Sequence, residues 1–393
     1  MPLAYQDPVH GEFNLPDRFR TLIESRSVNR LRNIKQLGLT VSRYPGAVHS
    51  RFEHTLGTAA VANDLLEALG CADDNTTNRV TLACLLSEVG ITPLSYSTRS
   101  VFQSVGLDKN SIRSILYNYD LSSVPGVSAL HGGDVIKPGF RVAVESWDAV
   151  AKNLGPFGYM DFVRLASTVD YVMRDAHYCG RAHGGFDYRR FRVALSRISD
   201  ADAVAEIFDE LQALHRAVHA LNAVYGDADR RVLTIVMNRL ATSLIETQLL
   251  SPTDLTEPAA LVDMDDDQFL GLLIEATERA AASSLRWCTD ALSAVVERAE
   301  CEYFPLERTL EDEGASAENI AARIAKDKGT EPWRVVLIGG SVDDGAGFRV
   351  FGSEFTSLSA AMESDLFSDC TGLDAKRIRP VVTGPERIAI VRP

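Results

Sequence analysis

The sequence predicts a mainly α-helical protein, a bundle of helices with a small α+β appendage at its C-terminal end. Apolar residues recur at helical spacing through most of the stretch from residue 16 to residue 300. After a polar stretch at 311–331, short β-branched runs alternate with glycine, which is typical of strands and turns. We expect domains at 1–310 (core motifs 5–195, helical extension 196–310) and 330–393.

The composition is that of a globular protein with an acidic surface. The chain has 393 residues, of which 46% are hydrophobic and 24% charged, and its formal net charge is −14. Such a charge argues against general nucleic-acid binding, which depends on Lys and Arg neutralising phosphates. A small anionic ligand needs only a few well-placed cations, so a phosphate-binding pocket stays open.

Cysteine spacing and the N-terminal segment indicate the compartment. Six cysteines are scattered without a C-x-x-C pair, so we expect reduced, buried thiols rather than disulfides or metal ligands. The segment "MPLAYQDPVHGEF" lacks a basic region followed by an apolar stretch, and no run of eighteen apolar residues occurs. We therefore expect a cytoplasmic protein that has no membrane association.

The first predicted helices lie between residues 18 and 90. "FRTLIESRSVNRLRNIKQLG" has helical apolar spacing and ends at Gly38, a plausible C-cap. "HTLGTAAVANDLLEALG" is amphipathic and stops at Gly70. "NRVTLACLLSEVG" is nearly all apolar up to Ser87, which predicts a buried helix ended by Gly90 and by Pro93.

Further helices are expected along the rest of the large domain. The segment 159–180 has one apolar face, and helical patterns follow at 200–225, 227–250 and 265–300. The region 97–157 is rich in Ser, Gly and Pro and has no clear period. In the appendage, the expected strands are "WRVVLIGG", "FRVFGSEF", "KRIRPVVTG" and "RIAIVRP", with a short helix at "SLSAAMESDLF".

Charged residues gather at the start of the second predicted helix. "YPGAVHSRFEHTLG" brings His49, Arg51, Glu53 and His54 together near a helix N-terminus. Free backbone N–H groups and the helix dipole favour an anion there, so these residues suggest a phosphate site. A surface turn of mixed charge is the alternative that spacing alone leaves open.

Four ordered motifs resemble a known family. "DPVHGEF", "VNRLRNIKQLG", "YPGAVHSRFEHTLG" and "VDYVMRDAHYCG" have the order and approximate spacing seen in HD-domain deoxynucleoside triphosphate triphosphohydrolases. The match spans about residues 5 to 195, and "LNAVYGDADRRVLTIVMNRLATSLI" looks like a weaker continuation. The resemblance implies the helical HD fold and a site for a deoxynucleotide.

The resemblance also implies a metal site, and this chain departs from it. In that family a His, an adjacent His-Asp pair and a distant Asp hold a divalent metal that activates water. Carried over, these positions are His54, Ser87, Glu88 and Ser167. Serine hydroxyls are poor ligands, so we expect weak metal binding and no confident catalytic residue. The two later histidines of the motif fall on Ile91 and Tyr96.

The positions that face the substrate in the family are retained. They are Gln36 and Leu37, Arg51, Tyr171, and Asp175. By the resemblance, Gln36 and Asp175 recognise the deoxyribose, Tyr171 packs near the sugar and Arg51 contacts phosphate. Fold bracing is the alternative for Asp175. For Glu88, the alternative is a partly buried acid paired with Arg51 or with a basic residue from a partner protein.

Some relatives have a second, regulatory nucleotide site in the segment matched by "ESRSVNRLR". Glu24, Asn29 and Arg32 stand where an Asp, a Gln and an Arg normally lie. Arginine can stack on a base and pair with phosphate. Salt bridges along a helix are the alternative role for these side chains.

Three functions fit these observations. The first is a catalytically inactive or impaired HD-domain protein that binds a (deoxy)nucleotide as a regulatory or sensing subunit, in a homo-oligomer or beside a partner protein. The second is a phosphohydrolase whose non-standard site holds Mn, Mg, Fe or Zn through His54, Glu88 and a residue such as His131 or Asp134. The third is a protein-interaction subunit with an empty pocket, whose appendage offers a strand edge. No cofactor is expected under the first and third functions.

Overall fold

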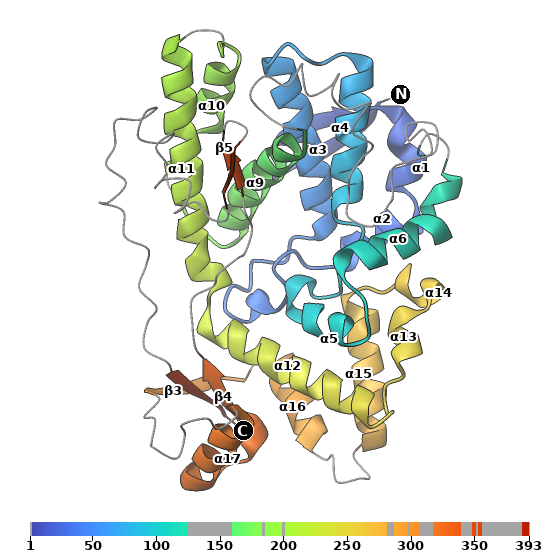
Figure 1. The fold of residues 1–393 in the computed structure, drawn as a ribbon, viewed down its shortest axis with the longest axis vertical. Helices are drawn as coiled ribbons and strands as arrows, with labels where there is room; N and C mark the ends of the chain where they lie inside the picture. Colours follow the sequence, from blue (N-terminus) through green and yellow to red (C-terminus); the bar gives the residue numbers. More distant parts are fainter. Residues whose placement is uncertain are drawn as a thin grey trace.

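The computed structural model is an elongated bundle of helices (Figure 1). It describes residues 2–124, 127, 159–182, 185–198, 201–280, 287–297, 299–305, 317–338, 348–350, 353–355 and 387–392. Helices dominate these residues, and the few strands are short, as the sequence predicts. Within the described part of the chain, no helix has the length and apolar character needed to cross a membrane.

The N-terminal segment is a hairpin followed by short helical turns. Its elements are β1 (Leu3–Asp7), β2 (Gly11–Leu15), η1 (Asp17–Phe19), α1 (Arg20–Ile23), α2 (Arg26–Asn29), η2 (Arg30–Asn33) and η3 (Gly38–Ser42). The prediction of one helix ending at Gly38 is therefore wrong. The chain becomes extended at Ser25 and again at Ile34, and Gly38 starts a turn at φ +50° instead of ending a helix.

Three helices form the centre of the upper bundle in Figure 1, namely α3 (Arg51–Ala68), α4 (Asp74–Ser87) and α9 (Tyr159–Tyr178). A capping box starts α3: Ser50 Oγ accepts from the Glu53 N–H, while the Glu53 carboxylate accepts from the Ser50 N–H. Asp73 caps α4 by accepting from the N–H groups of Asn75 and Thr76. α3 packs against both α4 and α9, so the ends of these helices meet in the interior.

The remaining helices extend and support this centre. They are η4 (Ser95–Thr98), α5 (Arg99–Ser104), α6 (Lys109–Tyr119), η5 (Leu121–Ser123), α10 (Tyr188–Leu195), α11 (Ala201–Tyr225), α12 (Ala228–Glu246), α13 (Pro252–Thr256), α14 (Pro258–Leu261), α15 (Asp266–Ala280) and α16 (Trp287–Val296). The long helices agree with those predicted for 200–225, 227–250 and 265–300. α12 follows the lower end of α11 and runs across the lower part of the molecule, in contact with β4, α15 and α16 (Figure 1).

The C-terminal end adds a small sheet and a helix. β7 (Arg387–Val391) lies between β3 (Cys301–Pro305) and β4 (Val335–Ile338), antiparallel to both. β5 (Phe348–Val350) and β6 (Ser353–Phe355) form a hairpin, and α17 (Ala317–Lys328) and η7 (Pro332–Arg334) complete the elements. The predicted segments 357–367 and 376–384 and the glycines 339, 340 and 345 lie outside the described residues.

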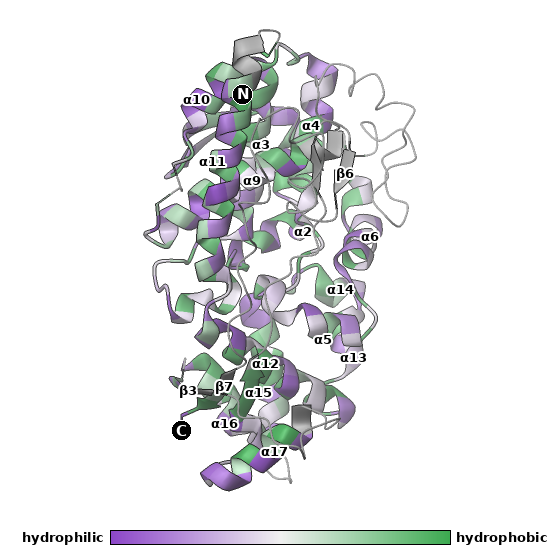
Figure 2. Ribbon diagram, turned by 60° about the vertical axis from the view of Figure 1, so that its left-hand side comes forward, coloured by the Kyte–Doolittle hydropathy of each residue, from purple (hydrophilic) through white to green (hydrophobic). Residues whose placement is uncertain are grey.

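The C-terminal sheet shares the hydrophobic core of the bundle. Trp333, Val336 and Val391 are buried in the same cluster as the α3, α4 and α9 side chains. An Arg239 guanidinium N–H of α12 also donates to the Val335 carbonyl (3.0 Å). Figure 2 shows the sheet beside α12, α15 and α16. The division into two domains stays a prediction.

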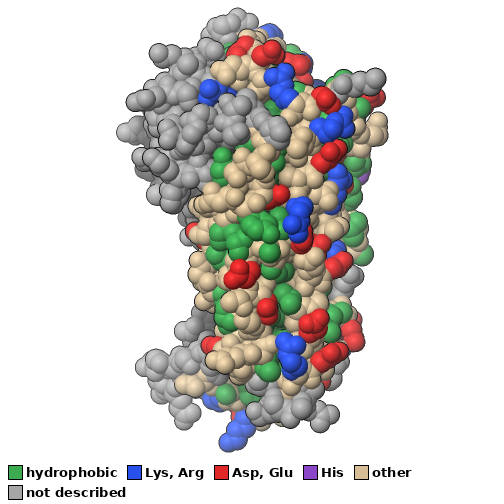
Figure 3. Space-filling view, turned by 90° about the vertical axis from the view of Figure 1, so that its right-hand side faces the viewer, with side chains coloured by type: hydrophobic (Ala, Val, Ile, Leu, Met, Phe, Trp, Pro, Cys, Tyr) green, Lys and Arg blue, Asp and Glu red, His purple; other side chains and the backbone are tan. Residues whose placement is uncertain are grey.

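The surface and the cysteines match the composition. On the side where α6 and α14 lie, acidic and basic side chains are interspersed, and no large field of one sign forms (Figure 3). The five described cysteines are free thiols, as predicted, but only Cys84 and Cys288 are buried, since Cys71, Cys179 and Cys301 are partly exposed. Cys370 lies outside the described residues.

Gly57 permits the closest approach between α3 and α9. A Cβ at this position would overlap the Asp170 carboxylate and the Arg174 guanidinium, both buried. We expect Gly57→Ala to lower the free energy of unfolding by about 3 kcal/mol, because the buried pair must separate or shift. Urea unfolding at pH 7 measures this loss.

Gly271→Ala is the matched control. Gly271 lies inside α15, and no atom lies within 4 Å of its added Cβ. The control variant should gain roughly 0.5–1 kcal/mol, since alanine favours the helix over glycine. Equal stability changes in the two variants would contradict the close packing of α3 on α9.

Candidate functional site

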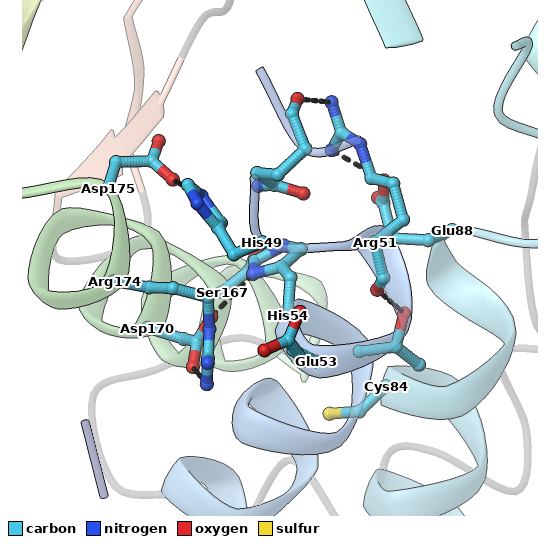
Figure 4. A network of polar contacts seen from close by, with 12 residues as sticks. His49, Arg51, Glu53, His54, Cys84, Glu88, Ser167, Asp170, Arg174 and Asp175 are labelled. Atoms are coloured by element: carbon cyan, nitrogen blue, oxygen red, sulfur yellow. Dashed lines mark hydrogen bonds and ion pairs between the residues drawn. The ribbon is translucent and has the colours of Figure 1, made fainter. Parts of the chain in front are cut away.

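Asp170 of α9 lies at the centre of a buried polar network (Figure 4). Its carboxylate accepts two N–H bonds from Arg174 (2.8 and 3.1 Å) and contacts His10 Nε2 (2.7 Å) and His54 Nδ1 (2.6 Å). Arg174 also donates to Asp7 (2.9 Å). Asp170 and Arg174 are fully buried, so each contact is made in a region of low dielectric.

The charges of this network shift the pKa values of Asp170 and Arg174 in opposite directions. Burial alone would raise the pKa of Asp170, but Arg174 and the two histidines hold it well below its usual range. Burial would likewise lower the pKa of Arg174, and Asp170 and Asp7 together raise it. Two carboxylates face one guanidinium, which leaves one negative charge. His10 and His54 both contact the Asp170 carboxylate beside that charge.

Glu88, at the C-terminal end of α4, forms a second buried group. Its two oxygens accept from Arg51 (2.8 Å) and from Lys109 (2.6 Å). Arg51 additionally donates to Ser95 Oγ (2.9 Å) and to the Gln36 carbonyl (3.1 Å). Burial would raise the pKa of Glu88, but Lys109 and Arg51 hold it well below its usual range. The internal pairing that the sequence left open as an alternative is thus present.

A strained turn carries Ser95 to Arg51. Leu94 and Ser95 both have left-handed backbone conformations (φ 52° and 56°), which are costly for residues other than glycine. The buried Asp266 carboxylate holds the turn by accepting from the N–H groups of Leu94 (2.5 Å) and Lys35 (3.0 Å). Burial raises the pKa of Asp266. The turn therefore depends on an acid supplied by α15.

Asp175 of α9 lies at a third group of contacts. Its carboxylate contacts His49 Nε2 (2.8 Å) and accepts from the Tyr225 hydroxyl (2.6 Å). The His49 ring stacks on Tyr178 at 4.5 Å, and Tyr171 meets Tyr225 edge-on at 6.5 Å. The predicted Asp175 and Tyr171 are therefore brought together, and Asp175 also braces α9 against α11.

The four positions of the predicted metal site do not fit a metal. The Ser87 hydroxyl donates to the Cys84 carbonyl of its own helix (2.8 Å), and Glu88 is neutralised by two cations. The Ser167 hydroxyl lies 3.3 Å from His54 Nε2. Among the described residues, no group of three His, Cys, Asp or Glu side chains is placed to hold a metal ion. The alternative ligands His131 and Asp134 lie outside those residues.

Gln36 and Leu37 lie beside Arg51. Gln36 is 5% exposed and Leu37 is 9% exposed. The Gln36 side-chain oxygen is buried and has no hydrogen-bond partner in the described structure, as is also true of His49 Nδ1. A buried acceptor without a partner costs roughly 1–3 kcal/mol, so such atoms mark a place where a ligand group or water bonds.

The predicted regulatory site coincides with a cavity of about 290 Å³. Glu24 and Arg32 line it, together with Pro2, Leu3, Ala4, Tyr5, Arg20 and Ile23. Asn29 does not line it and instead accepts from Arg32 Nε (2.8 Å). The Arg32 guanidinium carbon lies 3.6 Å from the centre of the Phe52 ring, which fixes the side chain at the cavity wall.

Several important residues were not singled out from the sequence. Asp7, His10 and Asp170 complete the buried network, Lys109 binds Glu88, and Tyr225 binds Asp175. "DPVHGEF" and "VDYVMRD" were noted only as motifs, although they contain the first three of these residues. The last two lie on α6 and α11, and no spacing in the sequence connects them with the site.

Comparison with known proteins supports the resemblance drawn from the motifs. The human deoxynucleoside triphosphate triphosphohydrolase SAMHD1 is 25% identical over 272 residues, 60% of this chain and 43% of that protein. The SAMHD1 homolog of Dictyostelium discoideum is 28% identical over 233 residues, which cover 54% of this chain and 43% of that protein. The uncharacterized protein YwfO of Bacillus subtilis is 31% identical over 213 residues, 52% and 46%. The chain spans about half the length of these relatives.

A solved structure supports the fold. A hypothetical protein from Aquifex aeolicus superposes with a TM-score of 0.63 at 19% identity, covering 100% of this chain and 97% of that one. No family model matches the chain. The mainly α fold with a small sheet is therefore shared over the full length, and the triphosphohydrolase likeness is confined to part of it.

The ion pairs of Glu88 predict acid-sensitive stability. The pKa of Glu88 is lower in the folded protein than the ordinary value of 4.5 for a free glutamate. The ion pairs of Glu88 therefore stabilise the fold fully above that pH, and their contribution decreases as the pH falls below it. We expect Glu88→Gln to lose about 3 kcal/mol at pH 7, since Arg51 is left buried without its carboxylate. Urea unfolding at pH 7 and near pH 4 measures both values.

The exposed Glu246 of α12 provides the control for this charge change. Glu246→Gln should alter stability by less than about 0.5 kcal/mol at either pH. The difference between wild type and Glu88→Gln should narrow at the lower pH. A difference that is equal at both pH values would show that folding does not lower the pKa of Glu88.

Proposed function

We propose that this chain is an HD-domain protein that binds a deoxynucleotide as a regulatory ligand and lacks the metal-dependent hydrolysis of the enzymes it resembles. The named relatives are deoxynucleoside triphosphate triphosphohydrolases, which supports a nucleotide-related site. The same proposal includes a cytoplasmic location and assembly either into a homo-oligomer or with a partner protein.

The observation that carries nucleotide binding is the unpartnered side-chain oxygen of Gln36. An amide offers both a donor and an acceptor, so it can bond a sugar hydroxyl and favour ligands that have one. Gln36 lies in a buried setting beside Leu37, whose apolar side chain supports the face of a sugar or base. The other predicted contacts, Tyr171 and Asp175, lie on α9, where Tyr225 and His49 hold the Asp175 carboxylate.

The absence of metal-dependent hydrolysis is proposed from the donor set. A divalent metal would meet one imidazole that is already bonded to Asp170, and one carboxylate that already binds two cations. Both serines are neutral, and Ser87 is directed at its own helix. Removing Glu88 from its cations to serve a metal would leave buried charges unpaired, which opposes metal binding.

Removing the Gln36 amide should separate binding from folding. We expect Gln36→Leu to weaken the affinity for a deoxynucleoside about tenfold, because the hydroxyl loses its partner. The unfolding free energy should stay equal or rise, since an unsatisfied buried oxygen is removed. Isothermal titration with the four deoxynucleosides and their triphosphates, with urea unfolding in parallel, measures both.

Gln268, exposed on α15, supplies the control substitution Gln268→Leu. The control should leave affinity unchanged. Incubation with deoxynucleoside triphosphates and Mn²⁺ should release neither triphosphate nor phosphate. Turnover that requires Mn²⁺ would contradict the proposed loss of hydrolysis, and failure of every deoxynucleoside and triphosphate to bind would contradict the nucleotide role.

The cavity beside Arg32 supports a second, regulatory nucleotide site as a further candidate function. Arg20, Arg32 and Tyr5 offer two cations and an aromatic ring around a space of about 290 Å³. Nucleotide binding there would pair phosphate with arginine and place the base against Tyr5. We expect two binding events in the titration above, of which Arg32→Ala removes one.

A further inference from the structure

Three cations lie around Glu88, at the position where the family that this chain resembles has a His-Asp pair. Lys109 Nζ and Arg51 contact the two carboxylate oxygens at 2.6 and 2.8 Å. Arg113 donates to the carbonyl of Ser87 (2.7 Å); burial lowers the pKa of Arg113, and the negative charge of Glu88 opposes this lowering in part. Three positive charges thus face the negative charges of Glu88 and Asp108, leaving an excess of one in a chain whose net charge is −14.

The fold places these cations by two local features. Lys109 is the first residue of α6, whose N-cap Asp108 accepts from the Ser111 N–H (2.7 Å). Gly90 follows α4, and a Cβ there would overlap the carbonyl oxygen of Lys109. The glycine therefore lets the start of α6 approach the end of α4 closely enough for Lys109 to reach Glu88.

We propose that Arg51, Lys109 and Arg113, here called the cation cluster, form a metal-free binding site for the phosphate groups of the ligand. The positive charge that a divalent metal supplies in a metal-dependent site is supplied here by the chain itself. This inference rests on the proposed function, because it assigns the phosphate end of the same nucleotide. Phosphate is the ligand class because it carries several negative charges and accepts many hydrogen bonds.

Lys109 makes the direct contact, and the two arginines act through their charge. The Lys109 side chain is 34% exposed, and its ammonium has three N–H donors, of which one serves Glu88. Arg51 and Arg113 are 3% and 8% exposed. Buried charges are screened little by salt, so they attract an anion that sits on Lys109 at the surface of the cluster.

Asp108 reduces the excess charge only in part. Its charge also acts on Arg113, but the residue is largely exposed and lies near a further cation, Arg99. Backbone and side-chain hydrogen bonds from Ser111 occupy its carboxylate and lower its pKa. The cluster keeps a positive potential toward solvent at Lys109.

Calorimetric titration in EDTA tests the site with inorganic tripolyphosphate, a deoxynucleoside and the matching triphosphate. We expect tripolyphosphate to bind without metal and to bind more weakly at higher salt. Lys109→Gln should weaken tripolyphosphate and triphosphate binding about tenfold and leave the deoxynucleoside affinity unchanged. Lys109→Arg should retain most of the affinity, because the charge is kept.

Two further variants keep the test independent of folding. Lys326→Gln removes the same charge from the exposed end of α17 and should leave all affinities unchanged. Glu88→Gln removes the carboxylate that competes with phosphate for Lys109, so the affinity for tripolyphosphate should rise. Circular dichroism measures the folded fraction of this variant, and the affinity is calculated for that fraction.

The outcomes separate the two proposals. Tripolyphosphate binding that depends on Lys109 supports the cluster even if no deoxynucleoside binds. Deoxynucleoside binding without tripolyphosphate binding, equal affinities in wild type and Lys109→Gln, or binding that requires added Mg²⁺ or Mn²⁺ would each overturn the cluster and leave the nucleotide proposal standing. If no ligand binds, both proposals fail.

Discussion

The bond between the Asp170 carboxylate and the Arg174 guanidinium is the interaction on which the site depends. Both groups are fully buried on one helix, four residues apart, and Asp7 in the N-terminal hairpin and His54 on α3 attach to them. Gly57 allows α3 to approach this pair, so the packing of α3 on α9 is set by an ionic contact as well as by apolar burial. Removing one partner would leave a buried charge unpaired and strongly destabilise the fold. The pair therefore links the N-terminal hairpin, α3 and α9.

The described carboxylates of the site, Asp170, Glu88 and Asp175, each have an internal partner. These pairings limit the groups that remain free to bind a metal ion or a ligand. Asp170 is bound by Arg174 and two histidines, Glu88 by Arg51 and Lys109, and Asp175 by His49 and Tyr225. These pairs leave few free donors for a metal ion. Among the described residues, the Gln36 side-chain oxygen and His49 Nδ1 are buried near these pairs without a hydrogen-bond partner. This arrangement is the basis of the proposal that the site binds an anionic, hydroxylated ligand and does not cleave it.

Sequence reasoning predicted the helices well where a period was sustained, as in α9, α11 and α12. It failed for residues 18–38, because helical spacing of apolar residues does not show that the backbone turns out of the helix at Ser25 and Ile34. It brought Gln36, Arg51, His54 and Glu88 to one place through motif order. It could not find Lys109 or Tyr225, since such contacts depend on how α6 and α11 pack and leave no local pattern.

The central claim is that internal ion pairs have replaced the metal in holding this site together. The most direct test is the midpoint of thermal unfolding after exhaustive chelation, followed by titration with Mn²⁺, Fe²⁺, Mg²⁺ and Zn²⁺. The pairs predict a midpoint that chelation leaves unchanged and that millimolar metal shifts by less than about one degree, because a ligand stabilises a fold only when its concentration approaches its dissociation constant. A saturable rise of several degrees near one equivalent of any of these metals would contradict the account.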